Sequence, residues 1–158
     1  MRRSVALLMV LASTVAACGD TTPVRVGPLP LCVSTDQAML ILMAQAVPTA
    51  EQIPCVEEIP VGWGLRQADI ESGEVELTFG HQGFGEVTVT LTSTCDWRRD
   101  ESQDEADGLE VSTVESRGGC VTVEAPRRVA ATEMTAALSF VTRESLREQS
   151  GLELRDRR

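Results

Sequence analysis

The chain has 158 residues, a formal net charge of −10 and 42% hydrophobic residues. This length suits one domain plus a targeting segment and is short for two independent hydrophobic cores. The hydrophobic content argues against a wholly disordered chain. The acidic balance argues against a nucleic-acid partner, because a protein needs a positive field to meet phosphates.

The first 17 residues have the layout of a secretory signal peptide. Arg2 and Arg3 precede an unbroken apolar run from Val5 to Leu11, and small residues follow up to Cys18. This order of charge, apolar core and small residues is what the export machinery recognises. The apolar stretch is shorter than the about 20 residues that a membrane-spanning helix needs. Residues 1–17 are therefore predicted to be a cleaved signal rather than a permanent span.

The string Val15-Ala16-Ala17-Cys18 resembles the lipobox of bacterial lipoproteins. The resemblance implies cleavage before Cys18, lipid modification of its thiol, often a fatty acyl group such as palmitate on the new α-amine, and anchoring at the extracytoplasmic face of the cell membrane. Stable anchoring takes two or more acyl chains. The alternative is a plain secretory signal with Cys18 nearby by chance. Where an organism has two membranes, the choice between them stays open.

Residues 18–31 are predicted to be the lipid-bearing tether of the domain. Pro23, Pro28 and Pro30 lie in this stretch and favour an extended, stiff geometry. The domain itself is then expected over residues 32–151, and residues 152–158 are predicted to be a frayed tail.

Four cysteines remain after the lipobox, namely Cys32, Cys55, Cys95 and Cys120. An even number in an exported chain predicts two disulfides. Three pairings are possible, and Cys32–Cys55 with Cys95–Cys120 is favoured because each pair joins neighbouring predicted elements. No two of these cysteines have the close spacing of a zinc site, and the chain has one histidine, so zinc binding is disfavoured.

A buried helix is predicted over residues 38–47. The run is apolar nearly all round, Pro48 ends it, and Ser34 with Gln37 forms a capping-box pattern before it. A short helical turn is expected from Thr49, within a stretch that Pro54 keeps irregular.

From Trp63 onward, apolar and polar residues alternate as in half-buried strands. Two further strands are expected after the acidic stretch 96–107, which is predicted to be a mobile surface loop. The predicted strands cover residues 65–70, 75–79, 87–91, 109–114 and 120–124.

Helical spacing returns near the C-terminus. Met134, Leu138 and Val141 are predicted to share one helix face, and Thr142 to cap a second helix over residues 143–150 that Gly151 ends. The sum is a single small α+β domain, an antiparallel meander of four to five strands with helices before and after it on one face.

Four short strings resemble an uncharacterised family of exported actinobacterial proteins. They are QAVPTA at 45–50, IPC at 53–55, PVGW at 60–63 and GGCVT at 118–122. The resemblance spans about residues 32–125. It implies an exported, cysteine-paired domain, and it assigns no catalytic residues.

Candidate catalytic groups are few. His81, the single histidine, lies in a glycine-rich connection (80–85) and is predicted to be an exposed loop residue rather than a general base. Carboxylate pairs such as Glu74 and Glu76 leave open a small envelope hydrolase, although alternation predicts that this pair lies on a solvated strand face. The acidic residues Asp100, Asp104, Glu105 and Asp107 are predicted to be solvated charge rather than a Ca²⁺ site.

The remaining candidates concern binding. Phe84, at a predicted hairpin tip, and Trp63 are the possible partner contacts, with a core-anchor role also open for Trp63. Met39 and Met43 could line the cavity of a small-ligand carrier or simply fill the core. The sequence predicts a non-enzymatic, cofactor-free module that binds an envelope protein or a small ligand.

Overall fold

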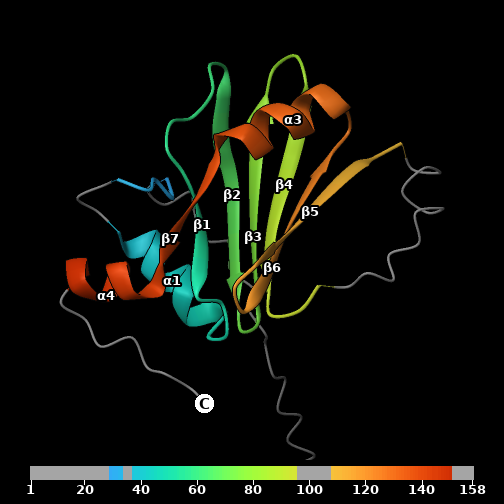
Figure 1. Ribbon diagram of the computed structural model, residues 1–158. Helices are drawn as coiled ribbons and strands as arrows, with labels where there is room; N and C mark the ends of the chain where they lie inside the picture. Colours follow the sequence, from blue (N-terminus) through green and yellow to red (C-terminus); the bar gives the residue numbers. More distant parts are fainter. Residues whose placement is uncertain (1–28, 34–36, 96–107, 151–158) are drawn as a thin grey trace, which may run out of the picture.

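The computed structural model describes residues 29–33, 37–95 and 108–150, which form an α+β domain (Figure 1). The elements in chain order are α1 (Ala38–Ala46), β1 (Gln52–Val56), β2 (Trp63–Glu71), β3 (Glu74–His81), β4 (Gly85–Thr92), β5 (Glu110–Ser116), β6 (Gly119–Ala125), α3 (Arg128–Ala137), β7 (Leu138–Thr142) and α4 (Arg143–Ser150).

Five strands form one antiparallel sheet in the order β2-β3-β4-β6-β5. The predicted fold class is therefore confirmed. The hairpin β5–β6 joins the first three strands through β6, which leaves β5 at one edge of the sheet and β2 at the other. β2 carries a bulge between Leu65 and Gln67, whereas the β5–β6 register runs without a shift.

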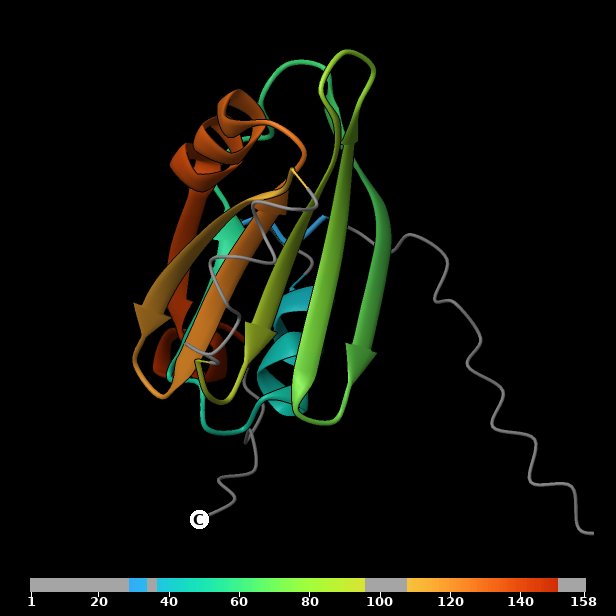
Figure 2. The ribbon, with the colours of Figure 1, turned by 90° about the vertical axis from the view of Figure 1, so that its right-hand side faces the viewer.

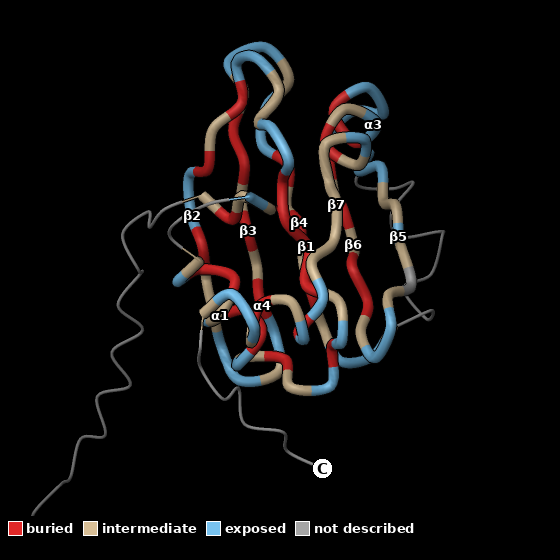
Figure 3. Tube along the Cα trace, turned by 60° about the vertical axis from the view of Figure 1, so that its left-hand side comes forward, coloured by how far each residue is buried: buried red, intermediate tan, exposed pale blue. Residues whose placement is uncertain are grey.

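One face of the sheet carries the hydrophobic core. Alternate residues such as Leu77, Val89 and Val123 are buried on that face, and Glu76, Thr90 and Thr122 lie across from one another on the other face. The helices and the β1–β7 ribbon cover the buried face (Figures 1 and 2). Burial is concentrated along the strands and falls toward the hairpin tips (Figure 3).

Two segments were expected to be helical or irregular and are strands. Residues 52–56 form β1, and residues 138–142 form β7, which pairs with β1 in an antiparallel ribbon. Pro54 is tolerated because β1 pairs with a strand on one side, where a missing N–H costs least. Leu138 and Val141 therefore do not continue the helix of Met134, since α3 ends at Ala137.

The helix predictions at the two ends of the domain are confirmed in part. α1 spans Ala38–Ala46, although Gln37 makes no side-chain capping bond, and Ser34 lies outside the described residues. α4 begins as predicted, because the amide of Ser145 donates to Thr142 Oγ1 at 3.1 Å. The predicted stop at Gly151 and the tail after it also lie outside the described residues.

Both favoured disulfides are present. Cys32 is bonded to Cys55 and Cys95 to Cys120, each pair with a Cα–Cα distance of 5.0 Å. The end of the predicted tether also contacts β1, because Val56 N–H donates to Pro30 O at 2.8 Å. The ordered domain thus starts slightly before Cys32.

The predicted signal peptide, Cys18 and the acidic stretch 96–107, predicted to be a mobile loop, lie outside the described residues. Among the helices of the described ranges, none has the length and apolarity to cross a membrane.

Candidate functional site

Trp63, His81 and Phe84 form an aromatic cluster where β2 meets the β3–β4 hairpin. The ring centroids of His81 and Phe84 are 4.6 Å apart, and those of Trp63 and His81 are 5.2 Å apart. His81 Nδ1 accepts hydrogen bonds from the backbone amides of Gly83, at 2.9 Å, and Phe84, at 3.2 Å. The ring therefore shapes the turn, and in its neutral form the proton lies on Nε2.

This geometry changes the interpretation of the glycine-rich connection. Half of residues 80–85 belong to strand ends, and His81 is the last residue of β3 rather than a loop residue. A Cβ on Gly62 would overlap the imidazole, with His81 Nε2 2.5 Å away. The sequence places glycine where the ring needs room, so His81 is a packed structural group.

The two predicted partner contacts differ in how much surface they offer. Trp63 is 7% exposed, and its Nε1–H donates to Glu133 Oε2 on α3 at 3.1 Å. It therefore ties the start of β2 to α3 as a core anchor. Phe84 is half-buried against the cluster, with its ring centroid 6.4 Å from that of Trp63. Only part of Phe84 is left for a partner.

Arg143, the first residue of α4, is a buried charged residue that sequence reasoning missed. Its guanidinium donates to the carbonyl oxygens of Ala44, of Val47 at 3.0 Å and of Ala50 at 3.2 Å. Ala44 lies in the last turn of α1, and Val47 and Ala50 follow the end of the helix, where a cation is favoured by the helix dipole. In the sequence, an arginine within a polar segment gives no signal of such burial. Arg143 also lines a polar depression of about 480 Å³ with Arg117, Arg147, Glu51 and Glu144.

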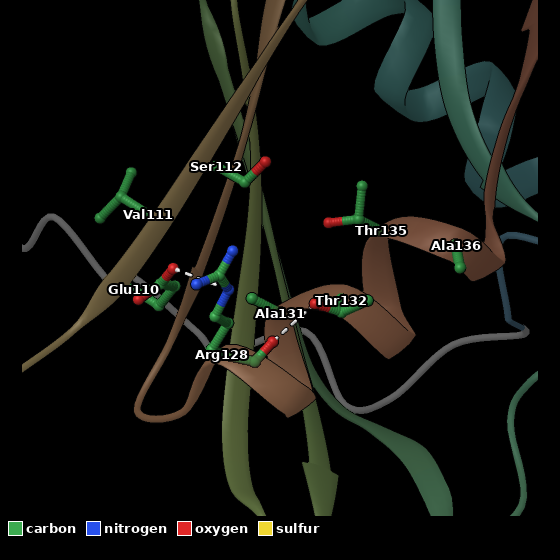
Figure 4. Close-up of a pocket in the computed structure, with 8 residues that line it drawn as sticks. All are labelled: Glu110, Val111, Ser112, Arg128, Ala131, Thr132, Thr135 and Ala136. Carbon is green, nitrogen blue, oxygen red and sulfur yellow. Dashed lines mark hydrogen bonds and ion pairs between the residues drawn. The ribbon is translucent and has the colours of Figure 1, made fainter.

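A groove of about 430 Å³ runs between the edge strand β5 and α3. We call it the α3 groove. Figure 4 shows its lining residues, and the hydroxyls of Ser112 and Thr135 point into the space between strand and helix. The residues that line it are Glu110, Val111, Ser112, Arg128, Ala131, Thr132, Thr135 and Ala136.

The α3 groove exists because α3 presents small side chains to β5. Ala131 and Thr135, and likewise Thr132 and Ala136, are four residues apart, so each pair shares a helix face. Thr135 Oγ1 is buried and has no hydrogen-bond partner among the described residues. An unpaired buried hydroxyl is unfavourable. In the sequence, the spacing of these small residues is the signal of the groove, but the same spacing also fits ordinary core packing.

The other predicted candidates have ordinary positions. Met39 and Met43 are buried in the hydrophobic core. Glu74 and Glu76 alternate with buried residues along β3, as predicted for a solvated face. The described residues include no cluster of histidine, cysteine and carboxylate groups able to hold a metal ion.

Comparisons with protein-family models, curated proteins and solved structures found no match to this chain. The resemblances to lipoproteins and to exported actinobacterial proteins therefore rest on the motifs themselves.

Proposed function

We propose that this chain is a lipid-anchored protein of the bacterial envelope, attached through Cys18 at the extracytoplasmic face of the cell membrane. There it serves as a non-enzymatic binding or accessory module for another envelope component. The predicted signal peptide and lipobox in the sequence support this localisation. The domain supplies the binding surface.

The observation that carries the proposal is the pair of disulfides within one small domain. Disulfides persist in oxidising compartments and are rare in the cytosol. They therefore support export, which is what the lipobox-like string also indicates. The α3 groove supports a binding role, because recognition sites are concave and combine apolar walls with a few placed polar groups.

Metabolic labelling tests the anchor. The full chain is expressed in a lipoprotein-producing bacterium fed a labelled fatty acid, beside a Cys18→Ala variant. We expect label and membrane fractionation for the wild type, and neither for the variant. A Cys32→Ala variant is the matched control, because it removes a cysteine and leaves the lipobox intact.

Equal labelling of the wild type and Cys18→Ala would contradict the anchor. A non-reducing peptide map of the same preparation tests export separately. Four free thiols at Cys32, Cys55, Cys95 and Cys120 would contradict residence in an oxidising compartment.

A further inference from the structure

The outer edge of β5 is open to pairing. β5 ends the sheet order, and no described strand pairs with its outer side. In an antiparallel pair, the backbone groups of alternate residues face away from the neighbouring strand. About half of the N–H and C=O groups of β5 therefore face away from β6, where an added strand can pair with them.

The two edge strands of the sheet differ in their protection against pairing with another strand. β2 has a bulge at Arg66, and bulges protect edges against pairing. β5 has neither a bulge nor a proline over residues 110–116, and its charged residues are Glu110 and Glu115. An edge strand without a bulge or a proline, beside a groove, is the arrangement in which an extended peptide adds a strand and places alternate side chains in the groove.

The unpaired hydroxyl of Thr135 indicates what the α3 groove lacks. Its Oγ1 is buried, without a partner in the described part of the chain, and it lines the groove opposite Ser112. A polar group on an incoming segment would satisfy it, which removes a cost present in the free domain.

Charge selects the kind of segment. The Glu110–Arg128 pair at the groove entrance is loose, with 3.9 Å between Glu110 Oε1 and Arg128 Nε, and both side chains are well exposed. Such a pair contributes little and leaves the local charge balanced. Because this pair adds no net charge, the net charge of −10 of the whole chain determines which segments are attracted. A basic segment is attracted, whereas a second copy of this acidic chain is repelled.

We infer that β5 and the α3 groove bind an extended, basic peptide segment of the partner protein, which pairs with β5 as a sixth strand. This inference rests on the proposed accessory function and names the chemistry of its partner.

A random peptide library tests the inference. Displayed ten-residue peptides are selected on the immobilised full chain in detergent. We expect enrichment of peptides rich in β-branched residues and lysine or arginine, without proline. Amide hydrogen exchange over residues 110–116 should slow when a selected peptide is added.

Two arginine substitutions on α3 locate the binding. Ala136→Arg places bulk and positive charge in the α3 groove from an exposed position, and should weaken binding of a selected peptide about tenfold or more. Val129→Arg is the matched control, because Val129 is 55% exposed on the same helix and does not line the groove. Its affinity should stay within about twofold of the wild type.

Thr135→Val separates binding from stability. It should lower the affinity for a selected peptide severalfold. The urea midpoint of the free domain should stay the same or rise, because an unpaired buried hydroxyl is removed.

Several outcomes would overturn the inference. They are an absence of enriched peptides, selection of acidic peptides, equal binding to Ala136→Arg and the wild type, and a dimer in sedimentation that Ala136→Arg dissociates. The last result would make a second copy the occupant. None of these results bears on fatty-acid labelling of Cys18, so failure of the groove and failure of the anchor are distinguishable.

Discussion

The α1 half and the α3 half of the domain cover the same sheet face and are filled in different ways. In the α1 half, large side chains such as Leu40 and Met43 pack against β2 and β3, and Arg143 closes the end of α1. In the α3 half, small residues such as Ala130 and Ala131 face the sheet, and the α3 groove remains. In the α1 half, large side chains and the hydrogen bonds of Arg143 fill the space over the sheet, and the depression beside them is polar. In the α3 half, a groove remains between α3 and β5, and it holds the unpaired hydroxyl of Thr135.

Removing either disulfide should have the largest effect on stability. The Cys32→Ala/Cys55→Ala and Cys95→Ala/Cys120→Ala variants should each lower the free energy of unfolding by about 3–4 kcal/mol, because the closed loops span 23 and 25 residues. Urea unfolding of the purified variants measures this. Nearly equal losses are expected. A much larger loss on removal of the Cys32–Cys55 disulfide would mean that this crosslink, rather than side-chain packing, stabilises the α1 half.

Arg143→Ala should cost about 3 kcal/mol, because it leaves three buried carbonyl oxygens without their charged donor. Arg117→Ala is the control, since that side chain is exposed in the same polar depression. Urea midpoints of the two variants give the comparison. Equal losses of stability in the two variants would contradict the role of Arg143 in stabilising the α1 half.

Gly118→Ala tests the contact between the halves. Gly118 has a φ of 71°, and a Cβ there would overlap the carbonyl oxygen of Thr49, beside the bond from Glu51 N–H to Arg117 O at 2.7 Å. We expect a loss of about 2–3 kcal/mol. Gly73→Ala, with a φ of 99° and open space around it, should cost about 1 kcal/mol. Thermal unfolding of the two variants measures this difference. Equal losses of stability would contradict the close contact between Gly118 and Thr49.

His81→Ala should have a smaller effect, about 1–2 kcal/mol, because two turn amides lose their acceptor and two aromatic rings lose a neighbour. Gln82→Ala, an exposed change in the same turn, is the control. Tryptophan fluorescence should shift for His81→Ala alone, since Trp63 contacts the imidazole. An unchanged spectrum would contradict the packed role of His81.

How far the sequence predicted the structure depended on whether local pattern and tertiary pairing agreed. The alternation of Val75, Leu77 and Phe79 predicted β3 because the same residues face the core. Thr142 predicted the start of α4 because a cap is a local interaction.

The misses arose where a distant partner decides the conformation. β1 is five residues long and contains Pro54, and pairing with β7 makes it a strand. Leu138 and Val141 keep helical spacing from Met134, so the pattern could not reveal that the backbone extends at Leu138. Arg143 and Thr135 belong to the same class, because burial in three dimensions has no single-residue signature.

The β1–β7 ribbon has a consequence for the order of folding. It pairs Gln52 with Thr142 and Val56 with Leu138, and so joins the beginning of the domain to its end. During synthesis β1 emerges long before its partner strand. The sheet β2–β3–β4 can assemble from neighbouring hairpins, but the layer that covers it closes only when residues 138–142 arrive. A chain that stops before Leu138 would therefore expose apolar sheet surface, and native folding becomes complete only with the last strand.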